Sequence, residues 1–232
     1  KTGVVVLAES TSNLSHKSFF TNIDKIIAPI ENLKNKHAVF LDLKPQILIT
    51  IGGMIISKKI KQFLRDYPAI DHFHIGLNTP NDTFYCGVKH IKVDPNLFFE
   101  KTLLQNTVDL NYYNLWLELY NKHQLCHKNF IKQAPFSDLI VFSVLSSKIP
   151  VNYQVHVANS SAIRYLQLFK MSEVNSIYCN RGTSGIDGST STAVGASAVN
   201  KTPTLLVTGD LSFFYDANGL WNSYVNSDFR II

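Results

Sequence analysis

A carboxylate that directly follows an apolar run is the first candidate for chemistry in this sequence. Asp210 comes after residues 204–208 and Gly209, and it precedes a segment with helical spacing. A glycine there lets the backbone approach a ligand closely, and the free N–H groups of Leu211 and Ser212 can point at an anion. A carboxylate beside a phosphate most often holds a divalent ion such as Mg²⁺. The same aspartate could instead cap the helix, and the local pattern leaves both interpretations open.

Two arginines lie in polar loops of the same part of the chain. Arg181 belongs to a loop, residues 180–189, that also contains three glycines, and Arg164 follows a polar stretch that starts at Asn159. Arginine binds carboxylates and phosphates through two parallel hydrogen bonds. We expect Arg164 in the first turn of a helix, where a cation opposes the helix dipole. We therefore interpret both arginines as ligand-binding residues, with a mobile loop and a surface salt bridge as the alternatives.

A group of lysines follows Gly52 and Gly53 at an expected turn from strand to helix. Lys58, Lys59 and Lys61 usually indicate a solvated helix face, although Lys58 or Lys59 could reach an anion. The sequence contains no P-loop, no GxGxxG and no GxSxG motif.

Histidines and cysteines occur in two short patterns that resemble metal sites. His123, Cys126 and His127 lie at helical spacing, and His72 and His74 alternate along one expected strand. Without further ligands, we interpret neither pattern as a zinc site. The three cysteines of the chain are widely spaced and form no CxxC pair, which indicates reduced thiols in a cytosolic protein.

The elements that must position these residues follow an α/β pattern. Short β-branched runs alternate with helical spacing, which predicts parallel sheets flanked by helices. From residue 110 to about 148 the pattern is helical throughout, so we place a domain boundary near residue 105, between domains 1–105 and 106–232. A strand begins at residue 229, so we expect the second sheet to be unfinished and the chain to be part of a larger protein. The expected strands are residues 4–7, 46–51, 72–75, 90–93, 155–157, 176–179, 204–208 and 229–232.

Composition excludes several classes of protein. Apolar residues make up 45% of the chain and charged residues 17%, which supports a folded core and argues against disorder. The net charge of +5 comes from the first 150 residues and is scattered, whereas a nucleic-acid surface needs a dense basic stripe. No apolar run approaches the roughly 18 residues that indicate a membrane-spanning helix.

Three segments in the second half of the chain carry a resemblance to a known family. They are NSSAIR at residues 159–164, NRGTSGIDGSTSTAVGA at 180–196 and TGDLSFFYDANGL at 208–220. In this order they resemble the 2-succinyl-5-enolpyruvyl-6-hydroxy-3-cyclohexene-1-carboxylate synthases, thiamine-diphosphate enzymes of menaquinone biosynthesis. The NRGxSGIDG loop is far more specific than the Gly-Asp signature of thiamine-diphosphate enzymes in general. The stretch VLAESTSNL at residues 6–14 also resembles the opening of that family's middle domain.

The resemblance implies an architecture and a reaction. The family has a pyrimidine-binding, a middle and a diphosphate-binding domain, so residues 1–105 would be the middle domain and 106–232 the first part of the diphosphate-binding domain. The implied reaction decarboxylates 2-oxoglutarate and adds the resulting succinyl carbanion to isochorismate. The implied cofactors are thiamine diphosphate and Mg²⁺ or Mn²⁺. The implied assembly is a homodimer or homotetramer of the full-length enzyme, with no nucleic acid and no membrane span.

The resemblance also assigns individual residues. Ile186 matches an aliphatic residue that keeps the cofactor bent, and Lys59 falls where some relatives have a substrate-facing arginine, although Lys58 fits as well. Both substrates are dicarboxylates, which arginines are suited to bind. The residues matched to the substrate are Ser160, Arg164, Arg181 and Lys59, and those matched to the cofactor are Ile186, Gly209, Asp210, Leu211 and Ser212, with Asp210 as the metal ligand.

Two parts of the family's machinery have no match here. The cofactor-activating glutamate belongs to the pyrimidine domain, and the asparagine that completes the Mg²⁺ motif follows the strand that begins at residue 229. We therefore expect these 232 residues alone to be inactive and to bind thiamine diphosphate weakly or not at all. The alternatives are a decarboxylase of the acetolactate-synthase type and a non-catalytic α/β binding domain, in which Arg164 and Arg181 would form surface salt bridges.

Overall fold

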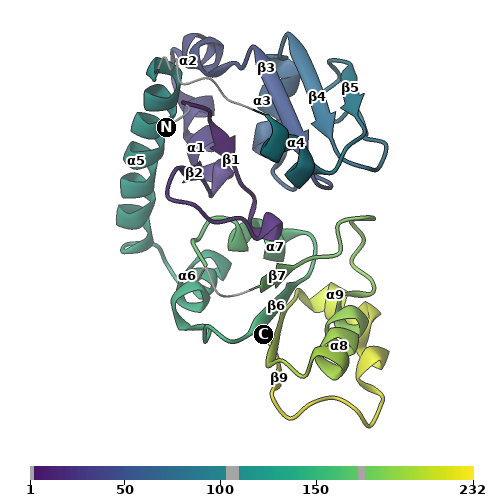
Figure 1. The fold of residues 1–232 in the computed structure, drawn as a ribbon. Coiled ribbons are helices and arrows are strands. Elements are labelled where there is room, and N and C mark those ends of the chain that lie inside the picture. The colour runs from purple at the N-terminus through teal and green to yellow at the C-terminus, as the bar shows by residue number, and fades with distance from the viewer. Residues whose placement is uncertain (1–2, 103–109, 172–175) are drawn as a thin grey trace. The chain divides into compact units, whose positions relative to one another are not determined.

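The β-branched runs of the sequence form parallel strands, and helices flank them (Figure 1). A computed structural model describes residues 3–102, 110–171 and 176–232. The chain folds into two compact units. The first unit comprises the chain up to Leu7 together with Ser18–Lys128. The second unit comprises Ala8–Lys17 and Asn129–Ile232. The predicted class, α/β with parallel sheets flanked by helices, is confirmed.

The first unit contains two small parallel sheets. Strand β1 pairs with β2, and the other sheet has the order β3-β4-β5. Its strands are β1 (Val6–Leu7), β2 (Phe19–Phe20), β3 (Ile47–Ile51), β4 (Asp71–Ile75) and β5 (Val88–Ile91). Its helices are α1 (Ile23–Ile27), η2 (Ala28–Asn32), α2 (Lys36–Leu43), α3 (Lys58–Asp66), α4 (Pro95–Lys101) and most of α5 (Asn111–Ile131).

Side-chain caps start two of these helices. Ser57 Oγ accepts a hydrogen bond from Ile60 N at 3.0 Å and so begins α3. Asp94 accepts from the backbone of the first turn of α4, where Pro95 occupies the first helical position. Both caps satisfy N–H groups that have no partner inside the helix.

The long helix α5 packs into the core of the first unit. Trp116 is 2% exposed, and its ring lies 6.2 Å from that of Phe20, which also contacts Tyr113 and Tyr120. The expected boundary near residue 105 lies outside the described residues. The compact units divide after Leu7, Lys17 and Lys128, because the apolar face of α5 is buried against the first unit. The domain bounds 1–105 and 106–232 stay a prediction.

This packing predicts a stability effect. Trp116→Leu should lower the free energy of unfolding by about 2 kcal/mol, because the smaller side chain leaves part of a buried cavity unfilled. Urea denaturation followed by circular dichroism measures it. Trp221→Leu is the matched control, since Trp221 is 86% exposed and its loss should cost less than about 0.5 kcal/mol. Equal losses in the two variants would contradict the assignment of α5 to this core.

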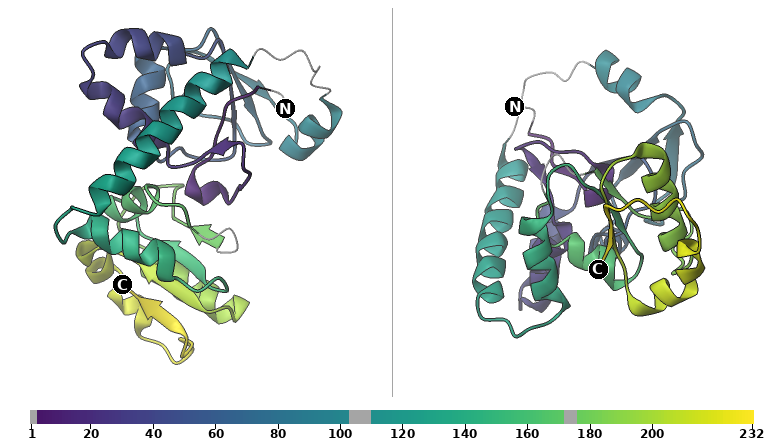
Figure 2. Two further views of the ribbon diagram at one scale, coloured as in Figure 1. Left: turned by 90° about the vertical axis from the view of Figure 1, so that its left-hand side faces the viewer. Right: turned by 90° about the horizontal axis from the view of Figure 1, so that it is seen from below.

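The second unit contains one parallel sheet with the order β7-β6-β8-β9. Strands β6 and β8 are buried along their whole length, as the central strands of a covered parallel sheet are. In Figure 1 and the right-hand view of Figure 2, α6 and α8 lie on opposite sides of this sheet. Its elements are η1 (Ser10–Ser12), α6 (Asp138–Lys148), β6 (Gln154–Val157), α7 (Ser161–Leu166), β7 (Ser176–Tyr178), α8 (Ser189–Asn200), β8 (Thr204–Val207), α9 (Asp210–Tyr215), η3 (Ala217–Leu220) and β9 (Phe229–Ile231).

The strand order creates a topological switch point between β6 and β8. The chain passes from β6 to β7 on one side and then crosses to β8 on the other side of β6. The loops after β6 and β8 therefore leave the sheet in opposite directions, which is where open α/β sheets bind ligands. None of the described helices is long and apolar enough to cross a membrane.

Candidate functional site

Asn159 ties together the loops at the carboxyl ends of β6 and β7. It follows β6 and is 3% exposed. Its Nδ2 donates to the carbonyl oxygens of Asn180 at 2.8 Å and Gly185 at 2.7 Å, and its Oδ1 accepts from Arg181 Nη1 at 2.8 Å. The loop of residues 180–189 is therefore held against the end of β6 by one buried amide.

Arg181 is oriented by this amide and not by a carboxylate. Its Nε is buried and has no hydrogen-bond partner among the described residues. A buried donor without a partner costs about 1–3 kcal/mol, so this atom is a candidate contact for a ligand or a water. Neither Arg181 nor Arg164 forms an ion pair in the described part of the chain, so the salt-bridge alternative finds no support there.

Ser160 and Arg164 lie at the turn from β6 into α7. The backbone of Ser160 has φ 70° and ψ −128°, a conformation that residues other than glycine rarely adopt. Ser160 is also exposed. A backbone conformation of this kind costs of order 1–3 kcal/mol of stability, and such conformations are concentrated at functional sites. Arg164 is also exposed, but α7 has six residues and Arg164 lies in its last turn, where a cation is favourable. The dipole argument for Arg164 is therefore wrong, and the unusual backbone of Ser160 is the stronger indication of a site.

Asp210 begins α9 at the carboxyl end of β8. The N-cap is Gly209, in extended conformation, so Asp210 is the first residue of the helix and not its N-cap. Its Oδ1 accepts from Leu211 N at 2.8 Å, and the described residues offer no donor to its Oδ2. The carboxylate is exposed and keeps an oxygen for a cation.

Ser212 joins this helix to the loop of residues 180–189. It is 4% exposed, and its Oγ donates to Ile186 O at 2.5 Å. The hydrogen bond fixes Ile186 beside the start of α9. The structure thus brings Arg181, Ile186, Asp210 and Ser212 to the same end of one sheet, as the parallel strands predict.

Lys59 lies in the first unit, in the first turn of α3. Its Nζ forms an ion pair with Glu31 at 2.5 Å, and both side chains are between one third and one half exposed. A surface ion pair of this kind contributes about 0–1 kcal/mol to stability, so it would hold Lys59 only weakly. The substrate contact expected for Lys59 stays a prediction, as does the alternative at Lys58.

Asp216 is a structural residue of this region that the sequence did not single out. It is 7% exposed, and its carboxylate accepts from Ser191 N at 2.7 Å and from the Ser191 hydroxyl. It thereby caps α8 from another element. Gly219 allows this approach, because a Cβ there would lie 3.1 Å from the Ser191 backbone.

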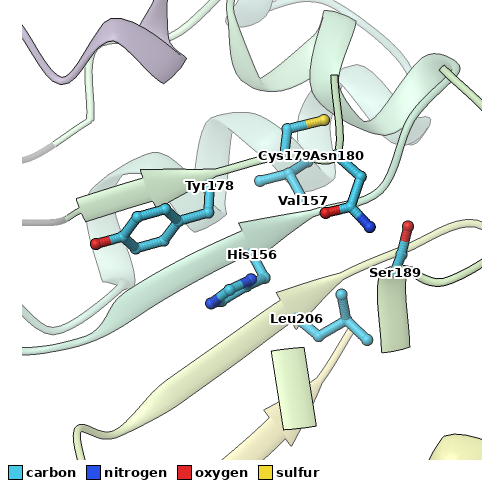
Figure 3. A pocket seen from close by; sticks show the side chains of 7 residues that line it. All are labelled: His156, Val157, Tyr178, Cys179, Asn180, Ser189 and Leu206. Atoms are coloured by element: carbon cyan, nitrogen blue, oxygen red, sulfur yellow. The ribbon is translucent and has the colours of Figure 1, made fainter. Parts of the chain in front are cut away.

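A shallow crevice, open to solvent, lies on the face of the sheet next to this site (Figure 3). The His156 ring stacks on Tyr178 of the neighbouring strand, with ring centroids 5.1 Å apart. Asn180 Nδ2 donates to Gly188 O and Thr192 Oγ1 at the edge of the crevice. Its lining residues are His156, Val157, Tyr178, Cys179, Asn180, Ser189 and Leu206.

Burial shifts the pKa values of two groups in this crevice, His156 and Cys179, toward their neutral forms. Burial lowers the pKa of His156 to about 4. Burial raises the pKa of the Cys179 thiol to about 11, although the nearby Arg181 charge opposes the shift. A thiol that stays protonated at neutral pH is a poor nucleophile. We therefore expect His156 and Cys179 to contribute packing and hydrogen bonds in this crevice, and not covalent catalysis.

The lowered pKa of His156 predicts a pH-dependent stability. Between pH 6.5, the ordinary histidine value, and about 4 the unfolded chain holds the extra proton, so the folded state loses stability as the pH falls. At about pH 5 this loss amounts to about 2 kcal/mol. His156→Phe keeps a ring against Tyr178 but does not titrate, so the variant should lose less stability than the original chain between about pH 7.5 and pH 5.

Urea denaturation at the two pH values measures this difference. Burial also lowers the pKa of His127 to about 4, but that residue is present in both proteins and cancels in the comparison. Identical pH dependence in the two proteins would show that His156 is not buried in its neutral form.

Comparison with known proteins gives close relatives over nearly the whole chain. No family model matches the sequence. The chain is 46% identical over 231 residues to the 2-succinyl-5-enolpyruvyl-6-hydroxy-3-cyclohexene-1-carboxylate synthase of Flavobacterium johnsoniae. It is 45% identical over 232 residues to that of Flavobacterium psychrophilum and 49% identical over 230 residues to that of Christiangramia forsetii. These alignments cover 99–100% of the chain but 40–41% of each relative, so the chain spans about two fifths of their length.

Proposed function

We propose that this chain, which is homologous over nearly its whole length to one segment of the 2-succinyl-5-enolpyruvyl-6-hydroxy-3-cyclohexene-1-carboxylate synthases, is part of such an enzyme. The complete enzyme would decarboxylate 2-oxoglutarate and add the resulting succinyl unit to isochorismate in menaquinone biosynthesis. The observation that carries the proposal is 45–49% identity over 99–100% of the chain.

The end of the second sheet fits a diphosphate and a divalent cation. Asp210 presents an exposed carboxylate with one oxygen unpaired among the described residues, and Mg²⁺ and Mn²⁺ prefer oxygen ligands. A Cβ added at Gly209 would meet nothing within 4 Å, so the backbone there is open to a ligand. Thiamine diphosphate, when bound, would supply the carbanion chemistry. Asp210 would hold the cation, with Gly209, Leu211 and Ser212 around the diphosphate and Ile186 against the cofactor.

The same loops fit acidic substrates. Both proposed substrates carry two carboxylates, which arginine binds with two parallel hydrogen bonds. Arg181 would bind a carboxylate while Asn159 holds the other edge of its guanidinium in place. Arg164 and Ser160 are exposed one helical turn apart and would contribute further hydrogen bonds. Lys59, with Lys58 as the alternative, is proposed as a further substrate-binding residue.

The proposal extends to the domains and partners of the complete enzyme. Residues 1–105 would correspond to the middle domain and 106–232 to the first part of the diphosphate-binding domain. The enzyme would act in the cytoplasm as a homodimer or homotetramer. The glutamate that activates the cofactor and the asparagine that completes the cation site would come from parts of the enzyme outside these 232 residues.

An assay of carbon dioxide release tests the function. The complete protein that contains this segment should release carbon dioxide from 2-oxoglutarate, in the presence of isochorismate, thiamine diphosphate and Mg²⁺. Turnover of pyruvate in place of 2-oxoglutarate would instead indicate an enzyme of the acetolactate-synthase type. Release from neither acid would support a non-catalytic domain and overturn the proposal.

A binding experiment tests the division of the site between segments. Calorimetry of the 232-residue chain with thiamine diphosphate and Mg²⁺ should show binding that is weak or absent, because the activating glutamate and the asparagine that completes the cation site would lie elsewhere. Submicromolar binding would show that this segment holds the cofactor by itself.

A further inference from the structure

The first unit contains a cluster of metal-ligating side chains that the proposed function does not use. His72 lies on β4, and Asp82 and Cys86 lie on the connection between β4 and β5. One ligand atom from each residue lies within 4.8 Å of the other two. This cluster, which we call the His72 cluster, brings together a nitrogen, an oxygen and a sulfur donor.

The His72 ring has one nitrogen with a hydrogen-bond partner and one without a partner among the described residues. The residue is 2% exposed, and its Nε2 lies 3.0 Å from Thr50 Oγ1 on the neighbouring strand β3. Its Nδ1 is buried and has no hydrogen-bond partner in the described residues. If Nε2–H donates to Thr50, then Nδ1 carries only its lone pair. Histidine ligands in metal sites are commonly fixed in this way by a hydrogen bond at the other nitrogen.

Asp82 shapes the loop that carries the sulfur ligand. Its carboxylate accepts from Cys86 N at 3.3 Å and from Gly87 N at 3.0 Å. Tyr85 and Gly87, with φ of 57° and 75°, provide the tight turn that returns Cys86 toward Asp82. Each carboxylate oxygen has a second lone pair, so Asp82 can hold the loop and still bind a cation.

The charges of the cluster suit a dication. A bound dication would displace the proton of the Cys86 thiol and pair with the carboxylate of Asp82, and a lone pair of the His72 ring would supply the third ligand.

We propose that His72, Asp82 and Cys86 bind a divalent transition-metal ion of the zinc class, with one coordination position left for water. A mixed nitrogen, oxygen and sulfur set is typical of Zn²⁺, whereas Mg²⁺ takes oxygen ligands. Metal–ligand bonds of about 2.0–2.3 Å place tetrahedral ligands less than about 4 Å apart, so small side-chain rotations close the cluster on an ion. The site lies wholly within the first unit and does not depend on the proposed synthase activity.

Cobalt is the probe that tests this site, because a thiolate bound to Co²⁺ absorbs light. Titration of the purified 232-residue chain with Co²⁺ should give a saturable thiolate-to-cobalt absorption at one ion per chain, which Zn²⁺ then removes. Cys86→Ser should abolish this absorption. Thr50→Val should weaken binding by about 10–100-fold, because it removes the hydrogen bond that orients His72. Circular dichroism of each variant without metal shows that the fold is kept.

The other two cysteines provide matched controls. Cys126 lies in α5 between His123 and His127, and Cys179 lies in the second unit. Cys126→Ser and Cys179→Ser should leave the absorption and the affinity unchanged. Absorption that survives Cys86→Ser would overturn the proposal, as would binding that does not saturate below millimolar metal.

Discussion

In a complete synthase that carries this segment, Asp210→Ala should lower turnover by on the order of 10³-fold. The carboxylate follows β8 at the topological switch point of the second sheet, and the described residues leave its Oδ2 without a donor. A cation held there would neutralise a diphosphate, and such charge stabilisation is worth several kcal/mol, where every 1.4 kcal/mol is about tenfold. The loss should come with weaker apparent affinity for Mg²⁺.

The measurement is initial rate against Mg²⁺ concentration at saturating thiamine diphosphate. Asp138→Asn is the matched control, because Asp138 also lies in the first turn of a helix of the second unit, α6, but follows no strand. The control should change stability slightly and leave the Mg²⁺ dependence unchanged. An Asp210→Ala enzyme with normal turnover and normal Mg²⁺ dependence would show that the cation lies elsewhere.

Local sequence patterns predicted the strands that position the site. The runs predicted as strands at residues 155–157 and 204–208 form β6 and β8, and both strands are buried along their whole length, as central strands of a covered parallel sheet are. The bounds of strands at the edge of a sheet were predicted less accurately. The strand expected at residues 90–93 forms as β5, Val88–Ile91, because Asp94 and Pro95 already begin α4.

The site residues were predictable where chemistry follows from residue type, and less so where it depends on tertiary contacts. Arg181 stood out as a ligand-binding type, but the Asn159 amide that orients it joins residues more than twenty positions apart. His72 showed only an alternating pattern on a strand. Its neighbours Asp82 and Cys86 approach it through a loop whose course no local periodicity describes.

The conformation at Ser160 shows a similar limit. A residue type does not reveal a positive φ, so the turn from β6 into α7 could be expected but its unusual backbone could not. The helix that follows proved to be six residues long, which moved Arg164 from the first turn to the last. In a helix this short, an error of one or two residues in its ends decides which turn a residue belongs to, so the helix-dipole argument depends on bounds that the sequence does not define.

The buried amide of Asn159 should matter to catalysis almost as much as the arginine it holds. In the complete synthase, Asn159→Ala should lower kcat/KM for 2-oxoglutarate or isochorismate by about 10²-fold, equivalent to about 3 kcal/mol. The variant removes the hydrogen bond to Arg181 Nη1 and the two that fasten the loop of residues 180–189. Arg181 then loses more side-chain entropy when substrate binds, because nothing has ordered it beforehand.

A double-mutant cycle separates this positioning role from a loss of folding. Arg181→Met alone should cost about as much as Asn159→Ala, and the double variant should cost little more than either, because both changes remove one oriented guanidinium. Asn226→Ala is the matched control, since Asn226 also bonds two acceptors through Nδ2 but joins α8 at Ser197. It should lower the melting temperature without a change in KM. Additive losses for Asn159 and Arg181 would mean that the two side chains act separately, and the amide would then stabilise the loop without orienting the arginine.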